Sequence, residues 1–278
     1  MKKSKGRRGP LSWTLYILVI GSALITFGIL IFLIAHILIN GIPHIKPSLF
    51  APEYNSENVS LMPALINTLF IAAVSLVIAV PIGIGSAIYL VEYAKRGNKI
   101  VNVIRMTTET LSGIPSIVYG LFGMLFFVKA LHMGMSILAG ALTLAIMILP
   151  LIMRTTEEAL KAVPDSYREG SFGLGAGRLR TIFRIILPSA MPGILSGIIL
   201  AIGRIVGETA ALMYTSGTVA KVADGLMGSG RTLAFHMYNL SSEGFHTDEA
   251  YATAVVLLVL VIIINWLSGL AARKLTKS

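Results

Sequence analysis

An arginine and a glutamate lie four residues apart inside one of the most apolar parts of this chain. They are Arg204 and Glu208, in the stretch GRIVGETAAL at residues 203–212. An ionisable side chain at the centre of a bilayer costs about 2.5–3.5 kcal/mol on insertion scales, so two of them in one apolar run indicate a function. At i, i+4 they are expected to share one face of a helix. Gly203 and Gly207 flank them and would let a neighbouring helix approach closely.

The chemistry that this pair offers is charge compensation for an anion. A guanidinium is a permanently charged, planar fork of donors that fits an oxyanion. Glu208 could hold Arg204 while no anion is bound, or accept a proton from a protonated oxyanion. The pair could equally be a structural ion pair that bridges helices. Thr209 and Ser112 could add hydroxyl donors, although hydroxyls in membrane helices usually bond the preceding turn of their own helix.

Composition places most of this chain in a membrane. Of its 278 residues, 55% are hydrophobic and 13% are charged, whereas soluble domains carry about 25% charged residues. The chain has no cysteine, which excludes disulfides, thiolate metal sites and cysteine nucleophiles. Its five histidines never have the i, i+4 spacing of a helical metal site. We therefore expect neither a metal nor a cofactor.

Six runs are long and apolar enough to be membrane-spanning helices, each of which needs about 20 residues. They cover about 11–39, 61–91, 111–128, 135–153, 191–215 and 250–270. Irregular backbone cannot face lipid, and these runs are too long for barrel strands. The sequence therefore predicts an all-α, polytopic membrane protein with one membrane domain over residues 11–278, preceded by a basic tail over residues 1–10.

Lysine and arginine concentrate on one side of the expected spans. Eighteen of the 23 fall in the two terminal tails and in the connections after the second and fourth spans. The opposite side holds Lys46, Lys129, Lys221 and Arg231. Basic segments stay in the cytoplasm, so we expect both termini in the cytoplasm of a prokaryote and the spans in its plasma (inner) membrane. The net charge of +10 then requires no nucleic acid.

The longest cytoplasmic connection, residues 154–190, has an internal pattern. Pro164 can open a short helix that runs to Phe172, and GLGAG at 173–177 ends it. Residues 178–187 are amphipathic, which is typical of a helix on a membrane surface. GLGAG is no nucleotide site, because neither a G-x-G-x-x-G after a strand nor a G-x-x-x-x-G-K-[ST] loop occurs.

A spaced motif in this connection resembles the cytoplasmic motif of ABC-importer permeases, which is Glu-Ala-Ala, three residues, glycine, nine residues, Ile-x-Leu-Pro. The matching residues are Glu169, Gly170, Ser171, Gly175, Ile185, Leu187 and Pro188. Gly170 and Ser171 depart from the pattern but are still small, so close packing against a partner should survive. The resemblance implies the type I ABC-importer permease fold, with a coupling helix that sits in a groove of the ATPase subunit and transmits nucleotide-driven motion. ATP hydrolysis then belongs to that separate subunit, and this chain is not an enzyme.

Two further stretches narrow the resemblance. SGIPSIVYGLFG at 112–123 and GRIVGETAAL together resemble the two permease subunits of phosphate ABC importers, and Gly-Glu-Thr-Ala is more similar to the A-type subunit. The resemblance implies import of inorganic phosphate, with Arg204, Glu208 and Thr209 in the substrate pathway. The implied partners are an ATPase dimer, a second homologous permease subunit and an extracytoplasmic phosphate-binding protein.

Three alternatives stay open at this stage. The cargo could be another oxyanion such as molybdate or sulfate, and the chain could be the C-type subunit. An ion-coupled secondary transporter needs no ATPase-docking loop, so the motif at 169–188 argues against it. A membrane enzyme would need converging catalytic groups, and Glu92, Glu109 and the histidines form no such constellation.

The absence of cysteine makes the predicted topology directly testable. We expect Ser4→Cys and Ser278→Cys to react with a membrane-impermeant thiol reagent only after the cells are permeabilised. Lys221→Cys, assigned to the opposite side, serves as the control that reacts from outside. Labelling of either terminus in intact cells would contradict this topology.

Overall fold

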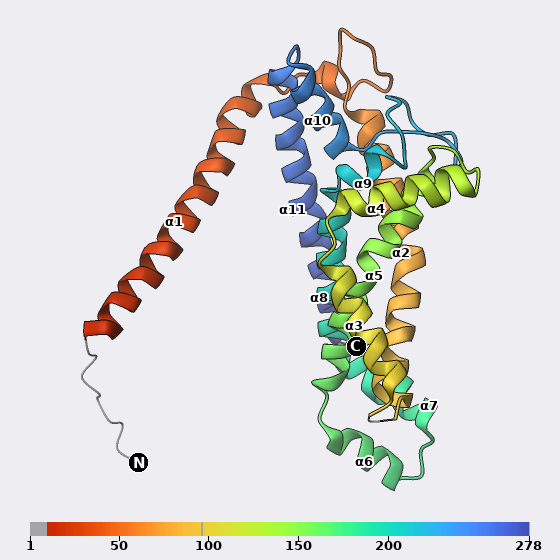
Figure 1. Ribbon diagram of the computed structural model, residues 1–278. Helices are drawn as coiled ribbons and strands as arrows, with labels where there is room; N and C mark the ends of the chain where they lie inside the picture. The colour runs from red at the N-terminus through yellow and green to blue at the C-terminus, as the bar shows by residue number, and fades with distance from the viewer. Residues whose placement is uncertain (1–9, 96, 278) are drawn as a thin grey trace.

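The computed structural model describes residues 10–95 and 97–277, which form a bundle of helices with no β-strand among them (Figure 1). The all-α polytopic fold is therefore confirmed. The α-helices are α1 Pro10–Gly41, α2 Met62–Ile88, α3 Lys99–Ser112, α4 Ser116–Gly123, α5 Ile137–Lys161, α6 Asp165–Gly173, α7 Arg178–Thr181, α8 Leu187–Val206, α9 Ala210–Met213, α10 Leu233–Glu243 and α11 Thr247–Lys277. The basic tail expected over residues 1–10 lies outside the described residues, except for Pro10.

Helix α5 forms the centre of the bundle. Its most apolar window is 67% buried, against 33% for the span that contains α2 and 28% for the one that contains α8. The main apolar core joins Ile71 of α2, Leu144 and Ile148 of α5, and Ile205 of α8. Lipid is as apolar as these side chains, so in a membrane this core is stabilised by close packing rather than by exclusion of water.

Glycines let the helices around α5 come into contact. A Cβ atom on Gly83 of α2 would lie 2.7 Å from Cγ2 of Ile152 on α5. On α8, a Cβ atom on Gly193 would lie 2.6 Å from the Cβ of Ala159. Small residues at such crossings are typical of membrane helices, where they increase van der Waals contact between backbones.

Helix α1 leaves the bundle and approaches it only near its last turns (Figure 1). None of its most apolar window is buried within this chain. Near that end, Gly41 packs against the backbone of Tyr251 on α11, and His36 Nε2 lies 3.3 Å from the Tyr251 hydroxyl. Through these contacts α11 holds the C-terminal turns of α1.

The expected third span, 111–128, differs from the structure. Helices α3 and α4 are bent by 103° at a short break, and a π-helical turn at Met124–Ala130 continues α4. The reason is Pro115, which lacks an N–H group and disfavours a helical conformation at the preceding residue. The Tyr119 hydroxyl donates a 2.8 Å hydrogen bond to the Leu111 carbonyl and ties the two helices together. Among the described residues, five helices are long and apolar enough to cross a membrane, or six if this bent pair is one span.

The connection expected over residues 154–190 is mostly helical. Helix α5 continues to Lys161, and α7, a π-helical turn at Ile182–Ile186 and α8 follow one another without a gap. Between them, α6 lies at one end of the bundle (Figure 1), which we call the α6 end. The opposite end, which carries α10 and the loop over residues 51–61, we call the α10 end.

The two glycines of α2 provide a matched test of this packing. We expect Gly83→Ala to lower the melting temperature of the purified protein, because a Cβ atom there meets Ile152 and overpacking costs about 1–3 kcal/mol. Gly85→Ala should leave it unchanged or slightly raised, because nothing lies within 4 Å of a Cβ atom there. Equal melting temperatures for the two variants in detergent would contradict the α2–α5 packing.

Candidate functional site

A charged cavity of about 470 Å³ extends from the α6 end of the bundle to Arg204. Its walls are α3, the second half of α5 and one residue of α8. The lining residues are Leu90, Arg105, Thr108, Glu109, Ser112, Pro150, Leu151, Met153, Arg154, Thr155, Glu157, Glu158, Lys161 and Arg204. Pro150 and Lys161 are eleven residues apart on α5, so the cavity follows this helix for roughly 16 Å at 1.5 Å per residue.

Most charges on the cavity wall are already paired. Glu157 Oε1 lies 2.7 Å from Arg105 Nη2 and 2.6 Å from Lys161 Nζ. Arg154 Nε lies 3.1 Å from Glu158 Oε1, one turn away on the same helix. Two carboxylates therefore hold three cations, and one of the three pairs, Arg105–Glu157, joins α3 to α5.

Apart from Glu109, Arg204 is the one charged residue on this wall for which the described structure shows no ion pair. It is half-buried, and in the described part of the chain no carboxylate lies within 4.0 Å of its guanidinium. The planar donor fork of a guanidinium binds an oxyanion through two parallel hydrogen bonds. Arg204 is thus a cation that is not neutralised by a carboxylate of its own chain, on the wall of a cavity that could admit an anion.

The expectation that Arg204 and Glu208 share one helix face is wrong. Helix α8 ends at Val206, and Glu208 lies in the break before α9. Glu208 is 8% exposed, and its Oε1 accepts a 3.0 Å hydrogen bond from the Ala211 backbone N–H. A carboxylate is stabilised at a helix N-terminus by free N–H groups and the helix dipole, so Glu208 caps α9 instead of pairing with Arg204. Thr209 occupies the N-cap position without a side-chain cap bond.

Close helix approach occurs at other glycines than those expected. Among the described residues, no neighbouring helix lies within 4 Å of a Cβ atom on Gly203 or Gly207. A Cβ atom on Gly120 of α4 would instead lie 2.8 Å from the Cα of Ala211, so α4 packs directly on α9. The Ser112 hydroxyl donates to the Glu109 carbonyl at 2.7 Å, as expected for a hydroxyl in a membrane helix.

The motif residues that begin at Glu169 form α6 and its end. Gly175 has φ of +82°, a conformation that glycine adopts at little cost. Its N–H bonds the Phe172 carbonyl at 2.9 Å, and the Ala176 N–H bonds the Ser171 carbonyl at 3.1 Å. This pair of bonds is the Schellman motif that ends helices. The expected helix stop at GLGAG is therefore confirmed, with Gly175 in the left-handed position.

The remaining motif residues divide between contact with the bundle and exposure. Ser171 is buried and its hydroxyl lies 2.8 Å from that of Thr181, which joins α6 to α7. Ile185 and Leu187 pack against a cluster that includes Ile186 and Leu160, and Pro188 opens α8. Glu169 and Gly170 are exposed. Large apolar side chains are exposed on the same segment, namely Tyr167, Phe172, Leu174, Leu179 and Phe183.

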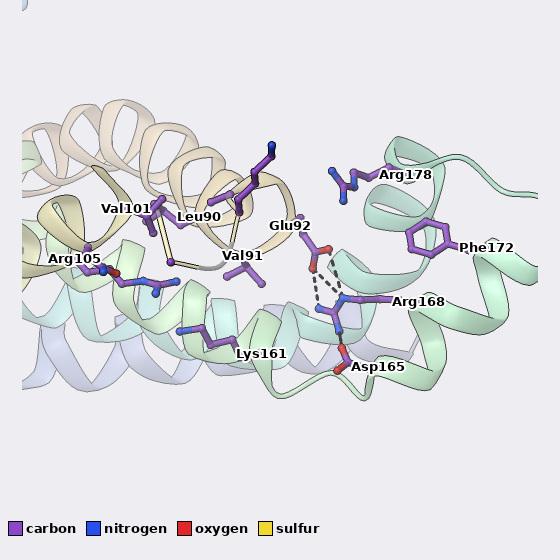
Figure 2. A pocket seen from close by; sticks show the side chains of 14 residues that line it. Leu90, Val91, Glu92, Val101, Arg105, Lys161, Asp165, Arg168, Phe172 and Arg178 are labelled. Atoms are coloured by element: carbon purple, nitrogen blue, oxygen red, sulfur yellow. Dashed lines mark hydrogen bonds and ion pairs between the residues drawn. The ribbon is translucent and has the colours of Figure 1, made fainter. Parts of the chain in front are cut away.

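A partly buried ion pair that the sequence did not indicate holds α6 against the bundle. Arg168 Nη2 lies 2.7 Å from Glu92 Oε1, and their side chains are 16% and 9% exposed. Figure 2 shows Glu92 and Arg168 facing each other on the wall of a pocket of about 490 Å³. Hydrogen bonding to Glu92 raises the pKa of Arg168 above its ordinary value. The two residues are 76 positions apart, so no local pattern connects them.

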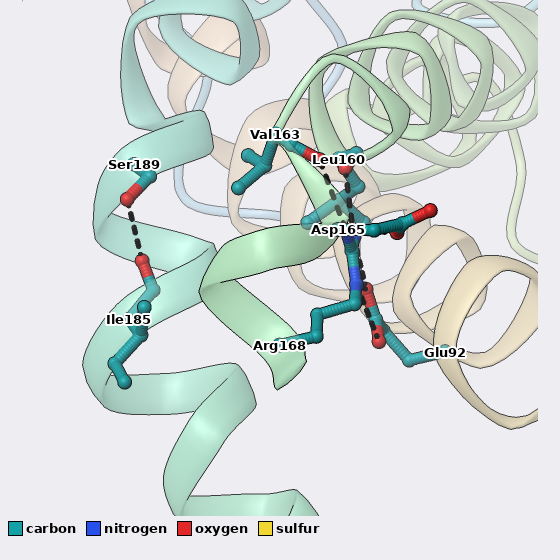
Figure 3. A network of polar contacts seen from close by, with 7 residues as sticks. All are labelled: Glu92, Leu160, Val163, Asp165, Arg168, Ile185 and Ser189. Carbon is teal, nitrogen blue, oxygen red and sulfur yellow. Dashed lines mark hydrogen bonds and ion pairs between the residues drawn. The ribbon is translucent and has the colours of Figure 1, made fainter. Parts of the chain in front are cut away.

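The same guanidinium also binds the end of α5. Arg168 Nη1 donates to the Val163 carbonyl at 3.0 Å, and Nη2 donates to the Leu160 carbonyl at 3.0 Å (Figure 3). Asp165 Oδ1 accepts a further bond of 3.1 Å from Nη1. Arg168 therefore joins three segments: the π-helical turn Tyr89–Tyr93 that follows α2, the end of α5 and α6 itself.

Comparison with known proteins identifies the family. The family described as binding-protein-dependent transport system inner membrane component matches residues 79–277. This chain belongs to that family. The permease is 34% identical over 276 residues to the probable ABC transporter permease protein YqgI of Bacillus subtilis, covering 91% of this chain and 94% of that protein. It is 38% identical over 205 residues to the phosphate transport system permease protein PstA 1 of Mycobacterium tuberculosis, covering 73% of this chain and 67% of that protein. The resemblance to A-type phosphate permeases is thus confirmed.

Solved structures support the fold of the permease. A bacterial ABC transporter involved in the import of the acidic polysaccharide alginate matches with a TM-score of 0.66 and 16% identity, covering 95% of this chain and 96% of that chain. The inward-facing MetNI methionine ABC transporter matches with a TM-score of 0.59 and 20% identity, covering 78% of this chain and 94% of that chain. The architecture is that of importer permeases.

Two glycines after α6 test the role expected of that helix. Gly175→Ala should leave the permease inserted but lower transport per ATP hydrolysed several-fold, because a side chain at φ of +82° strains the helix end. Gly177→Ala is the matched control, since its φ is −73° and nothing lies within 4 Å of a Cβ atom at either residue. If an assembled Gly175→Ala complex transports as much per ATP hydrolysed as the parent, the conformation of this helix end has no role in coupling.

Proposed function

We propose that this chain is the permease subunit of an ATP-driven importer that moves inorganic phosphate into the cytoplasm. The family establishes a multi-pass inner-membrane permease of an ABC importer. The names of several relatives support phosphate as the cargo. YqgI carries no cargo in its name, so the argument for an anion depends on the cavity itself.

The observation that carries the proposal is the unpaired guanidinium of Arg204. The other cations on the cavity wall already have carboxylate partners, so an arriving anion competes with no side chain for Arg204. The hydroxyls of Thr108 and Ser112 on the same wall donate to carbonyls of their own helix, at 2.7 Å each. The guanidinium is therefore the donor that selects an oxyanion here.

Glu208 and Thr209 belong to the proposed pathway through the helix break that follows Arg204. The Glu208 cap fixes where α9 begins and hence where the backbone leaves α8. In this proposal Glu208 acts by positioning the break beside Arg204. This differs from a direct ion pair, in which Glu208 would compete with the cargo.

We propose that α6 is the contact with the ATPase. Its exposed face combines Glu169 with the apolar side chains of Tyr167 and Phe172, and exposed apolar patches of this kind mark sites of protein association. A Cβ atom on Gly170 would have no other atom within 4 Å, which leaves room for a partner to approach the backbone. ATP hydrolysis then occurs on the partner subunit and not on this chain.

The rest of the proposed assembly follows from the family and from the charge pattern. It comprises an ATPase dimer, a second homologous permease subunit and an extracytoplasmic phosphate-binding protein. With both termini in the cytoplasm, the α6 end faces the cytoplasm and the α10 end faces outward.

The cargo is tested by uptake into proteoliposomes that contain this chain and its co-purified partners. We expect ATP-dependent uptake of radiolabelled phosphate that excess unlabelled phosphate suppresses. Equal concentrations of sulfate or molybdate should suppress it weakly. Uptake of molybdate or sulfate in place of phosphate would overturn the assignment of the cargo.

Substitutions at Arg204 test its proposed role. Arg204→Ala should lower uptake about 10- to 100-fold in an assembled complex, since a hydrogen bond to a charged group contributes about 1.5–3 kcal/mol and about 1.4 kcal/mol is tenfold. Arg204→Lys keeps the charge but loses the fork, so uptake should be impaired to an intermediate level. Glu208→Gln keeps an oxygen acceptor for the Ala211 N–H and should assemble normally. Normal uptake by an assembled Arg204→Ala complex would remove Arg204 from the pathway.

A further inference from the structure

A buried cation without a carboxylate partner lies at the α10 end of the bundle. Arg231 is 5% exposed, and its Nε and Nη2 atoms are buried with no hydrogen-bond partner. Its guanidinium carbon lies 4.6 Å from the centre of the Tyr54 ring. A cation–π contact of this kind offsets only part of the cost of burying an uncompensated charge. Within the described residues, Nε and Nη2 of Arg231 therefore lack a hydrogen-bond acceptor.

Polar groups next to Arg231 lack partners as well. Thr232 Oγ1 and both ring nitrogens of His236 are buried, and within the described residues none of these atoms has a well-formed hydrogen bond; His236 has only a weak contact with the Val59 backbone. The His236 ring lies edge-on to Tyr54, with 6.0 Å between ring centres. Together with Arg231, these residues contain five buried side-chain nitrogen and oxygen atoms that lack a well-formed hydrogen bond in the described structure, all between positions 231 and 236. We call Tyr54, Arg231, Thr232 and His236 the Arg231 cluster.

The Arg231 cluster is electropositive. Burial and, to a smaller extent, the charge of Arg231 lower the pKa of His236 to about 3, so the imidazole is neutral and its N–H is a donor. The Val59 carbonyl opposes this shift weakly. Thr232 and His236 flank the first turn of α10, where the helix dipole adds partial positive charge. The cluster thus combines one full positive charge with several donors, and no carboxylate in the described part of the chain pairs with it.

The backbone beneath the cluster is firmly anchored. Asn67 of α2 donates to the carbonyls of Lys221 and Arg231, at 2.8 and 3.2 Å, and accepts from the Ala223 N–H at 3.0 Å. Thr68 Oγ1 accepts from the Leu233 N–H at 2.8 Å. The start of α10 is therefore fixed to the first turns of α2. Buried polar groups normally find partners, so the unpaired donors indicate a missing acceptor rather than a loose loop.

We propose that the Arg231 cluster is a second anion-binding site, separate from Arg204, which takes one tetrahedral oxyanion at the α10 end. A small anion fits better than a carboxylate of a docking protein, because Arg231 and His236 are enclosed by their own chain. Access requires that Tyr54, which is half-buried and packs against Val59 and Leu240, moves off the guanidinium. The proposed function is used here only to choose phosphate as the first anion to test, and the site would meet the anion before the cavity at Arg204 does.

The test uses a single cysteine at Ser56, an exposed residue of the loop that carries Tyr54, in the complete complex in nanodiscs. We expect inorganic phosphate to change the rate of Ser56→Cys labelling by an impermeant thiol reagent. In the Arg231→Gln background the half-maximal phosphate concentration should rise about tenfold or more. Thr232→Val, which removes one donor without changing shape much, should raise it less. Lys46→Gln, which removes an exposed cation at the same end, is the matched control and should change nothing.

The outcomes separate this site from the proposed function. If phosphate still changes the labelling rate of Ser56→Cys in the Arg204→Ala background, there are two distinct sites. This result would support them even if uptake assays identified another cargo. Sulfate and molybdate are tested in parallel, so that an effect of any tetrahedral oxyanion that depends on Arg231 supports the site. The inference is overturned if none of these anions changes labelling, or if the effect is the same in Arg231→Gln and Thr232→Val as in the parent. The inference is also overturned if the labelling rate of Ser56→Cys changes only when a binding protein is added and does not depend on any anion.

Discussion

The ion pair between Arg168 and Glu92 is the contact on which the α6 end depends. Helix α6 is only nine residues long and projects from the bundle (Figure 1). Isolated helices of that length are marginal in water, so α6 needs tertiary contacts. Arg168 supplies them by binding Glu92 after α2 and two carbonyls at the end of α5. Removing one partner of this partly buried pair leaves a charge uncompensated and weakens the attachment of α6.

This contact also links the proposed ATPase surface to the cavity. The two segments that Arg168 holds belong to the helices that surround the cavity, since Leu90 and Lys161 both line it. Within the cavity, Glu157 ties α5 to α3 through Arg105. A displacement of α6 would therefore reach the turn after α2 through an ion pair, α5 through hydrogen bonds to two carbonyls, and α3 through the Arg105–Glu157 ion pair. We infer that this chain of contacts carries motion from α6 toward Arg204.

The sequence predicted what depends on local pattern. Apolar run length located the long apolar helices but neither α3 nor α10, which are less apolar. Pro164 and Gly175 predicted the limits of α6, because helix ends are set by residues with special backbone preferences. Pro115 carried a signal for the bend between α3 and α4, which the length of the apolar run obscured. The sequence predicted Arg204 as the partner of Glu208, whereas the structure gives the Ala211 N–H. The i, i+4 rule holds only while a helix continues, and α8 ends at Val206, before Glu208.

Other features could not be predicted from one sequence. The partners Arg168 and Glu92 are 76 positions apart, and hydrophobic periodicity contains no information about such pairs. Arg231 was counted only as a basic residue on the far side of the membrane. Its significance comes from burial and from the absence of an acceptor around it in the described structure, both of which are properties of the fold.

The central claim, that α6 acts on the cavity through the Arg168–Glu92 pair, is tested most directly by transport stoichiometry. The measurement is phosphate taken up per ATP hydrolysed in proteoliposomes, for Glu92→Gln and for Glu243→Gln as an exposed control at the α10 end. Our account predicts that Glu92→Gln assembles and still hydrolyses ATP but moves several-fold less phosphate per ATP, while the control is unchanged. A parental ratio in an assembled Glu92→Gln complex would contradict it.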